Sequence, residues 1–414
     1  MANTTLTADI IAKEAVMILD NNLVMAKQVF RGYEEDFAKR VNGYKIGDTL
    51  TIRKPADFTV RDGAAMNVQD VIEGTTQITV NKRKGVDFQF TSQDLTLKID
   101  QLSERVIKPA MVQLANQIDR DLMGLYASVP SWVGTPGQVV KSYKDFAQAP
   151  ERLDEGAVPT DERSAVLSPT DHWGLLGSQT ALFIQDAARG AYRQGSLGMI
   201  GGVDTYMDQN VPTHTVGAYG GTPLVAGAGQ VSTYDNVKDS NTQSLNTDGW
   251  TASISGLLRA GDIFTIAGVF AVNPVTKATL PYLREFVVVS DASSDGSGAA
   301  ALVISPAIIT SGAFQTVSAA PADNAAITVK GTASTGYRQN MVFHKNAFSL
   351  VMVDLQEPPG AVEVGRQSYQ GCRVRVIPVY DGIQDISKWR LDVLYGVKAI
   401  DPRLATRLSG LPIV

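Results

Sequence analysis

The chain has 414 residues, a net charge of −5 and 44% hydrophobic residues, a globular composition that suggests roughly two to three domains. The negative charge disfavours tight binding to a polyanion, and the densest basic run is only Lys82–Lys84. A single cysteine, Cys372, excludes an internal disulfide and the thiolate clusters of zinc or iron–sulfur sites. Asp9, Lys13 and Glu14 interrupt any secretory signal, and no run approaches the roughly 18 apolar residues of a membrane-spanning helix.

The N-terminal stretch from Thr7 to Phe30 has apolar residues at helical spacing, with Thr7 as a candidate cap. Within it, Ala15–Leu19 is apolar on all sides, so this part of the helix needs cover on every face. That cover comes either from its own domain or from another subunit, and we favour another subunit.

Residues 44–92 change to the period-two alternation of strands in three segments, Thr49–Arg53, Gln77–Val80 and Asp87–Phe90. Turn residues at Asp62-Gly63 and Glu73-Gly74 predict a long hairpin. Between its arms, Ala56–Thr76 has few large apolar residues, so the tip cannot bury itself. We therefore expect the tip to project and to need a partner.

Helical spacing returns over Asp100–Ala127, where a stripe of apolar residues steps by three or four positions and predicts the longest helix of the chain. Pro109 lies inside this stripe, where it removes a backbone hydrogen bond and clashes with the preceding turn. We expect either a kink there or a second helix that begins near Lys108.

Residues 141–220 are predicted to be mixed, with helices at Tyr143–Leu153 and Pro169–Leu176 and a strand at Ala165–Leu167. The next stretch, 221–344, holds only 14 charged residues in 124 positions, and such a shift in composition marks a domain. Its short predicted strands indicate a small barrel or sandwich: Trp250–Ile254, Ile263–Val272, Glu285–Val289, Ala301–Ile304 and Ala326–Val329.

After this domain the strands carry more charge, as the earlier ones do; they are Phe348–Leu355, Arg373–Tyr380 and Arg390–Ala399. The chain thus returns to the earlier domain, which makes residues 221–344 an insertion. The predicted fold class is α+β with an inserted all-β domain.

The sequence offers little support for catalysis. The three histidines, His172, His214 and His344, lie far apart and lack a second ligand two to four residues away. Ser168 precedes Asp171-His172 but has no Gly-x-Ser-x-Gly surroundings, so helix capping explains it better. We expect no catalytic residue.

Ligand motifs are also incomplete. The run Asp291-x-Ser293-x-Asp295-Gly296 opens like a calcium loop, but position twelve is Leu302, so a β-hairpin turn is favoured. The glycines between 195 and 229 form neither a dinucleotide-binding nor a phosphate-binding loop. We therefore expect no cofactor and no metal site.

Three local segments resemble one family. Ala187–Arg193 followed by Gly201–Asp204 is similar to the stretch before that family's insertion. Arg259–Val269 resembles its "RGDxxxxAGV" strand pair, and Leu394–Val397 with Asp401–Arg403 resembles its closing "YGVxxxxP" segment. With the order of elements derived above, the chain resembles the HK97 capsid fold and, within it, the P22-type coat proteins of tailed bacteriophages, which carry an insertion domain.

The resemblance implies a division into seven segments: an N-terminal arm (1–43), an E-loop hairpin (44–92), a spine helix with peripheral domain (93–140), a first axial part (141–220), an inserted β-barrel (221–344), an axial return (345–380) and a C-terminal peripheral segment (381–414). The implied function is that of a major capsid protein and not of an enzyme. Such a subunit assembles in the host cytoplasm and resides in the virion.

The resemblance also implies contact residues. In the E-loop these are Arg53, Lys54, Arg61, Asp62 and Glu73, although a solvated strand face explains any single one of them equally well. In the inserted domain, the loop Tyr234–Asp248 carries Asp235, Lys238 and Asp239, which would bridge neighbouring capsomers.

The implied partners are further copies of the chain in hexamers and pentamers, a scaffolding protein, a portal protein at one vertex and double-stranded DNA held by weak non-specific contacts; no membrane is involved. A separate scaffolding protein is expected because the chain begins directly with the arm. Two alternatives remain: an encapsulin-like nanocompartment shell, against which the inserted domain argues, and a carbohydrate-binding protein, for which a Trp-lined carboxylate cleft is missing.

Overall fold

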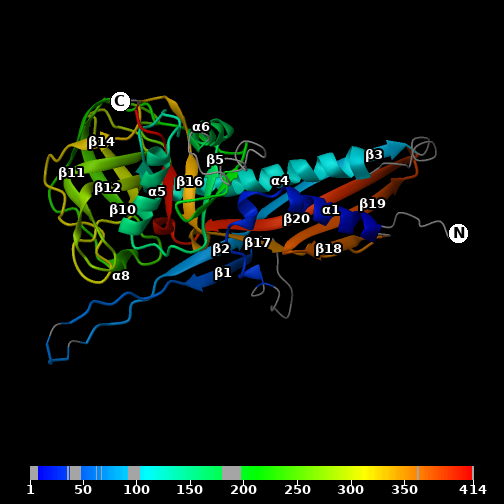
Figure 1. The fold of residues 1–414 in the computed structure, drawn as a ribbon, viewed down its shortest axis with the longest axis horizontal. Coiled ribbons are helices and arrows are strands. Elements are labelled where there is room, and N and C mark those ends of the chain that lie inside the picture. Colours follow the sequence, from blue (N-terminus) through cyan, green and yellow to red (C-terminus); the bar gives the residue numbers. More distant parts are fainter. Residues whose placement is uncertain are drawn as a thin grey trace. The chain divides into compact units, whose positions relative to one another are not determined.

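The computed structural model describes residues 8–34, 37, 48–61, 63–66, 68–91, 103–179, 197–360 and 363–412. The chain divides into two units (Figure 1). The first comprises Met1–Leu50, Gln77–Leu122 and Phe348–Lys398, and the second comprises Thr51–Thr76, Met123–Ala347 and Ala399–Val414. No helix in the described ranges is long and apolar enough to cross a membrane.

The first unit is built on a five-stranded sheet. In spatial order its strands are β17 (Phe348–Val353), β20 (Ile386–Ala399), β19 (Cys372–Asp381) and β18 (Gly365–Tyr369), and β3 (Lys82–Thr91) also pairs with β20. The long strand β20 is antiparallel to both β19 and β3. The predicted strand Asp87–Phe90 therefore lies in this sheet.

Helix α1 (Ala8–Asn22) packs against β18 and β19 of that sheet. A Cβ atom at Gly365 would lie 2.2 Å from the carbonyl oxygen of Ala8, so the approach of helix and strand requires glycine. Ala15 and Leu19 are buried by their own unit, whereas Met17 is 44% exposed. The expectation that another subunit covers this helix is thus wrong for all but its outer side.

The long helix begins where proline permits. A short π-helical turn, η2 (Ser103–Ile107), precedes α4 (Lys108–Met123), and the 3-10 turn η3 (Gly124–Ser128) follows it. Pro109 is the second residue of α4, where a backbone N–H has no intrahelical partner to lose. This confirms the prediction of a helix that begins near Lys108.

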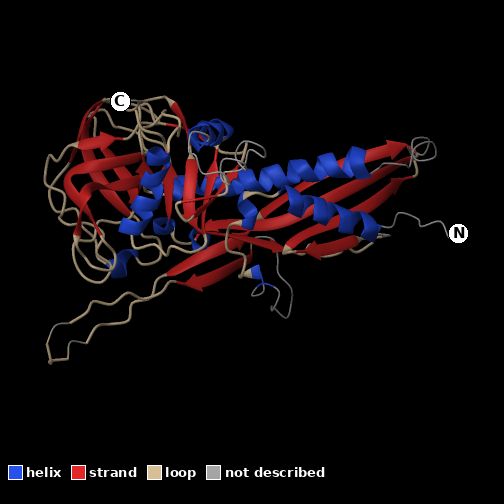
Figure 2. Ribbon diagram, in the orientation of Figure 1, coloured by secondary structure: helices blue, strands red, loops and turns tan. Residues whose placement is uncertain are grey.

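Buried and half-buried polar groups fasten α4 within the first unit. Asp119 accepts hydrogen bonds from the backbone N–H groups of Val24 (2.8 Å), which precedes the 3-10 turn η1 (Met25–Lys27), and of Ala26 (2.9 Å) within that turn. The Tyr395 hydroxyl of β20 donates to Asp121 at 2.8 Å. Figures 1 and 2 show α1 and α4 lying along the sheet.

The predicted hairpin is confirmed for β1 (Asp48–Arg53) and β2 (Thr75–Val80), which form a two-stranded ribbon, but its predicted extent to residue 92 is wrong because β3 pairs with β20. Between these strands, the described residues of 54–74 form neither helix nor strand. The side-chain amide of Gln69 links the two arms, because its oxygen accepts from the Thr59 backbone and hydroxyl groups, both at 2.9 Å.

The second unit contains a six-stranded mixed sheet. Its order is β4 (Trp132–Val133), β21 (Ala405–Leu408), β16 (Asn340–His344), β5 (Arg163–Leu167), β7 (Val203–Met207) and β6 (Met199–Ile200). Two helices accompany it, α5 (Tyr143–Glu155) and α6 (Pro169–Gln179), both as predicted. A capping box formed by Ser142 and Asp145 begins α5.

The inserted domain is a six-stranded antiparallel sheet that curls into a barrel. Its order is β14 (Ile327–Val329), β11 (Ile263–Val272), β12 (Thr279–Val288), β13 (Ala300–Ser305), β10 (Gln243–Trp250) and β9 (Gly221–Val225). A β-bridge between Leu224 and Ala326 joins the two ends. Phe264, Phe286 and Leu302 are fully buried in its core.

Three sequence predictions differ from the strand pairing. The predicted strand Trp250–Ile254 is wrong, because β10 ends at Trp250. Strand β16 lies inside the predicted insertion 221–344 but pairs with β5 and β21 of the mixed sheet. Residues 345–380 were expected to join 141–220, yet β17, β18 and β19 pair within the first unit. Alternation identifies a strand but not its partner.

The remaining elements are short. A ribbon of β8 (Thr213–Thr215) and β15 (Gly336–Arg338) lies at the chain's entry to and exit from the barrel. Three single turns complete the fold: α8 (Tyr234–Val237), η4 (Lys345–Ala347) and η5 (Pro402–Leu404). The predicted family segment Ala187–Arg193, the capping residue Thr7 and the contact residue Asp62 lie outside the described residues.

Candidate functional site

The base of the hairpin is anchored to the inserted domain by polar contacts. The Lys54 ammonium donates to the carbonyl oxygens of Lys238 (3.0 Å) and Asp239 (2.9 Å). The Asp239 carboxylate in turn accepts from the Thr75 N–H (2.7 Å) and hydroxyl (2.8 Å). These two donors hold the pKa of Asp239 below its ordinary value. A Cβ at position 74 would lie 2.3 Å from the Lys238 carbonyl oxygen, so Gly74 permits this contact.

The other predicted E-loop charges have partners within the hairpin. Arg53 and Glu73 form an exposed ion pair at 3.3 Å across its two arms. The Arg61 guanidinium donates to the carbonyl oxygens of Gly63 and, at 2.7 Å, Ala65. The structure therefore gives these charges a role in the shape of the hairpin, and their contact with another subunit stays a prediction.

Exposed apolar side chains occupy the same hairpin, and sequence reasoning missed them. Val60 is 97% exposed, and four others are also exposed: Phe58, Met66, Val68 and Val71. Monomeric proteins expose few such clusters unless a partner covers them. The sequence did contain a signal for this exposure: these apolar residues lie between two predicted turns, in a segment that cannot form a core of its own.

The predicted inter-capsomer residues lie at the start of the loop that carries them. Asp235, in α8, and Lys238 form an ion pair at 2.8 Å, with both side chains at least partly exposed. The Tyr234 ring stacks on Phe314 with centroids 3.4 Å apart, which holds α8 on the barrel. The predicted loop Tyr234–Asp248 is shorter than expected, because β10 begins at Gln243.

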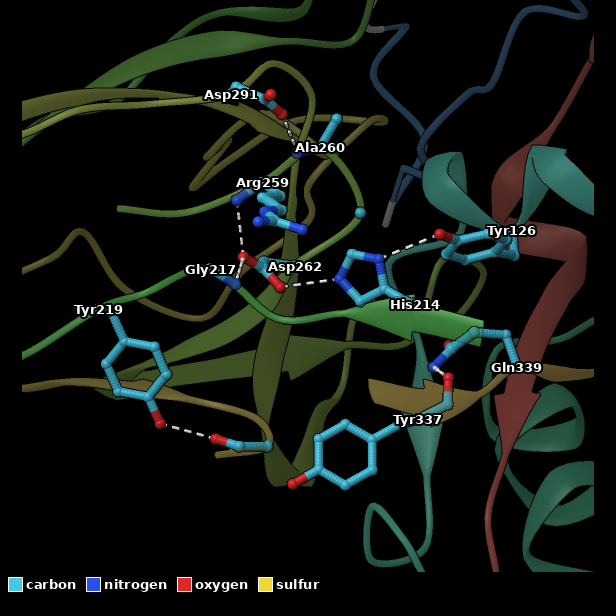
Figure 3. Close-up of polar contacts among 12 residues, drawn as sticks. Tyr126, His214, Gly217, Tyr219, Arg259, Ala260, Asp262, Asp291, Tyr337 and Gln339 are labelled. Carbon is cyan, nitrogen blue, oxygen red and sulfur yellow. Dashed lines mark hydrogen bonds and ion pairs between the residues drawn. The ribbon is translucent and has the colours of Figure 1, made fainter. Parts of the chain in front are cut away.

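A second polar cluster joins the barrel to the rest of the second unit (Figure 3). The buried Asp262 carboxylate contacts His214 Nε2 at 2.8 Å and accepts from the backbone N–H groups of Arg259 (2.7 Å) and Gly217 (3.0 Å). His214 Nδ1 lies 3.0 Å from the Tyr126 hydroxyl. Three segments far apart in the sequence are thereby fixed to one carboxylate.

Arg407 of β21 lies beside this cluster and is fully buried. Its guanidinium donates to the carbonyl oxygen of Gly261 (2.8 Å) and to Gln339 (3.3 Å), and it lies 5.1 Å from the Tyr126 ring centroid. Desolvation lowers the pKa of Arg407 to about 10. The side chain remains a cation at neutral pH and stabilises the junction through the aromatic ring.

The two motifs that resemble a catalytic site and a calcium loop have structural roles. The Ser168 hydroxyl and Asp171 carboxylate are 2.5 Å apart, and the same hydroxyl accepts from the Asp171 N–H at the start of α6. Asp295 accepts from Ser297 and from the Ala299 N–H, which closes the turn before β13. Among the described residues, no group of three His, Cys, Asp or Glu side chains could hold a metal.

The family model for the P22 coat protein, gene protein 5, matches residues 1–410. This chain belongs to the P22 coat protein family. It is therefore a major capsid protein of the phage head, a structural subunit of the virion and not an enzyme. The nanocompartment and carbohydrate-binding alternatives are set aside by this membership.

Individual relatives are distant. The major capsid protein of Acyrthosiphon pisum secondary endosymbiont phage 1 is 22% identical over 421 residues, which cover 98% of both chains. A structure from Mycobacterium phage Che8 covers 93% of this chain and 90% of its own, with 14% identity and a TM-score of 0.48. The CUS-3 coat protein I-domain is 27% identical over 27% of this chain and 96% of its own, with a TM-score of 0.19.

The predicted fold class and family are thus confirmed: the chain has a mixed α+β, HK97-like capsid fold with an inserted β-barrel-like domain. Capsid assembly also implies self-association. Which residues make the contacts between copies is a separate question.

Proposed function

We propose that residues 54–74 hold a neighbouring copy of the chain in the shell through the exposed apolar side chains of the hairpin. The observation that carries this proposal is the outward display of Phe58, Val60, Met66, Val68 and Val71. Complete burial of one such side chain contributes about 1.5–3 kcal/mol. Even partial burial of the set, repeated at every copy of a symmetric shell, would outweigh single exposed ion pairs of about 0–1 kcal/mol.

In this proposal the hairpin charges act before assembly. Lys54 and Asp239 hold the base, and the Arg53–Glu73 pair and Arg61 shape the arms, so less conformational freedom is lost when a neighbour binds. Asp62 belongs to the same predicted contact set and lies outside the described residues.

We further propose that Asp235 and Lys238 exchange their mutual pairing for partners on a neighbouring capsomer, as the family resemblance implies. The Asp235 and Lys238 side chains are 63% and 36% exposed. Each can therefore exchange its present partner, 2.8 Å away, for an equivalent charge on a neighbour. Asp239 is occupied by Thr75 and would instead hold the hairpin and the loop together.

The remaining assignments also rest on the resemblance: hexamers and pentamers, a scaffolding protein, a portal protein at one vertex and weak contact with packaged double-stranded DNA. Five of the seven segments keep their proposed family roles; the axial return 345–380 and the end of the insertion at 344 do not, because of the strand pairing described above. Co-expression with the scaffolding protein of the same phage should raise the yield of closed, uniform shells.

The decisive experiment replaces Val60, Met66 and Val71 together by serine in the full-length chain. Shell yield, measured by sedimentation and negative-stain microscopy, should fall at least tenfold, because the variant loses the apolar contact with its neighbour while its own core is unchanged. The matched control is Ile383→Ser, a substitution of an equally exposed residue in the first unit. Normal yield of uniform shells from the triple variant would refute the proposal.

A further inference from the structure

A cavity of about 80 Å³ in the second unit has an unusual excess of cationic side chains. Arg152 of α5, Lys277 and Arg284 of the β11–β12 hairpin, and Arg403 of η5 all line it. Two carboxylates, Asp57 and Glu285, share the wall. A water molecule needs roughly 10–15 Å³ of such space, so the cavity has room for a group of several heavy atoms.

Both wall carboxylates already have cationic partners. Glu285 contacts the Lys330 ammonium at 2.9 Å and the Arg152 guanidinium at 3.4 Å, and it accepts from the Trp132 N–H at 3.0 Å. Burial would raise the pKa of Glu285, but the two cations outweigh it and hold that pKa below the ordinary value. Asp57 lies 4.0 Å from Arg403.

Among the described residues, two cations in the wall form no ion pair: Arg284 interacts with Glu285, and Lys277 with Asp57, only at longer range. Within the described ranges, Arg284 Nε is buried without a hydrogen-bond partner, and no carboxylate lies within 4.0 Å of its guanidinium. In the part of the chain that the structure describes, Lys277 donates to the carbonyl oxygens of Pro274 (2.5 Å) and Ala313 and to no carboxylate. Desolvation lowers the pKa of both side chains, which is the mark of cations short of compensating charge.

We propose that this cavity binds an oxyanion, with Arg284 and Lys277 as its principal ligands and Arg152 at its edge. A planar guanidinium matches the two oxygens of a carboxylate or phosphate, and a charge-assisted hydrogen bond there would satisfy the buried Nε–H. The Arg152 guanidinium is held 3.5 Å from the Tyr282 ring centroid, so its position is set before the anion arrives.

Two sources supply this chemistry: a free inorganic anion such as phosphate, or the carboxylate of an Asp or Glu on a second copy of the chain. Both would neutralise the same two cations. They differ in when the site is filled, because a neighbour's carboxylate is present only in the assembled shell.

The first test uses the unassembled full-length chain and inorganic phosphate, with chloride added to keep ionic strength constant. Equilibrium dialysis should show saturable phosphate binding that Arg284→Gln weakens about tenfold or more. The matched control is Arg338→Gln, an exposed arginine outside the cavity, which should bind as the wild type does. Lys277→Gln provides a second variant if Arg284→Gln does not fold.

The same dialysis on assembled shells distinguishes the sources. Phosphate binding by both shells and free chains assigns a free anion, whereas binding by free chains alone assigns a neighbour's carboxylate that fills the cavity on assembly. Absence of phosphate binding to free chains, or equal binding by wild type and both cavity variants, would overturn the proposal. The free-chain measurement does not depend on how the hairpin acts in assembly.

Discussion

The inserted barrel and the extended hairpin use apolar side chains in opposite ways. In the barrel, Phe264, Phe286 and Leu302 from three different strands meet in one fully buried core. In the hairpin, Val60 and Val71 lie between the two strands of the ribbon, in a segment without helix or strand, and their side chains are exposed. A sheet that closes on itself buries its own side chains, whereas a two-stranded ribbon cannot.

This difference separates stability from assembly. Barrel residues stabilise the folded state of the isolated chain, so their replacement should lower its free energy of unfolding. Under the proposed role, the exposed hairpin residues contribute only when a neighbour is present, so their replacement should leave the unfolding of the isolated chain unchanged. Four measurements test that separation.

The largest effect is expected in the barrel core. Phe264→Ala removes a fully buried ring and should lower the free energy of unfolding by about 3–5 kcal/mol. Phe270→Ala is the control on the same strand, β11, because its ring is 38% exposed, and it should cost about 0.5 kcal/mol. Urea denaturation monitored by circular dichroism measures both. Equal costs would mean that the barrel is not packed as described.

The next effect is expected at the junction of the barrel with its unit. Asp262→Ala leaves the N–H groups of Arg259 and Gly217 and the His214 ring without their acceptor and should cost about 1–3 kcal/mol. Asp291→Ala is the matched control, since this exposed carboxylate accepts one hydrogen bond from the described residues, that of the Ala260 N–H. Urea denaturation measures both variants. Equal losses of unfolding free energy would contradict this role of Asp262.

The hairpin base should respond to pH, and the barrel core should not. The pKa of Asp239 is lowered in the folded chain by the two Thr75 donors, so its contribution is present above the ordinary carboxyl pKa of about 3.9 and is lost as the pH falls through the lowered value. Hydrogen exchange of the Thr75 amide should then accelerate relative to the Lys54 amide, whose acceptor is the Gly74 carbonyl.

Asp239→Asn provides the control for this titration. The asparagine oxygen can still accept from Thr75 but does not ionise in this range, so the ratio of the two exchange rates should become independent of pH. A ratio that changes with pH as much in the variant as in the wild type would show that another group controls the hairpin base.

The smallest effect on unfolding is expected at the hairpin tip. Val60→Ser alone should change the free energy of unfolding by no more than about 0.5 kcal/mol, because the side chain is 97% exposed. The measurement is again urea denaturation of the unassembled chain. A larger loss would place Val60 in a core of its own chain and would remove the contrast with the barrel.

Much of the fold could be predicted from local pattern. The start of α4 at Lys108 follows from the backbone chemistry of Pro109, and β11 spans the predicted Ile263–Val272 because alternating β-branched and aromatic residues suit a half-buried strand. The turn at Asp295 and the cap at Ser168 were likewise predicted, since each is formed by residues within four positions of one another.

The candidate sites could not be predicted to the same depth. Asp262, His214 and Tyr126 contact one another although 48 and 88 positions separate successive members. Lys54 reaches Asp239 over 185 positions. No local pattern encodes such pairs, and a predicted charged contact set gave no hint that exposed valines lie beside it.

The sequence by itself determined the helix or strand class of most described segments, the presence of an inserted β domain and, through its motifs, the family. Only the tertiary structure decided that β3 and β19 flank β20, that β16 leaves the insertion for the mixed sheet, and that the Nε atom of Arg284 is buried without a hydrogen-bond partner among the described residues. The physical reason is range: backbone propensity and alternation act over a few residues, whereas strand partners and buried charges depend on which distant segments pack together.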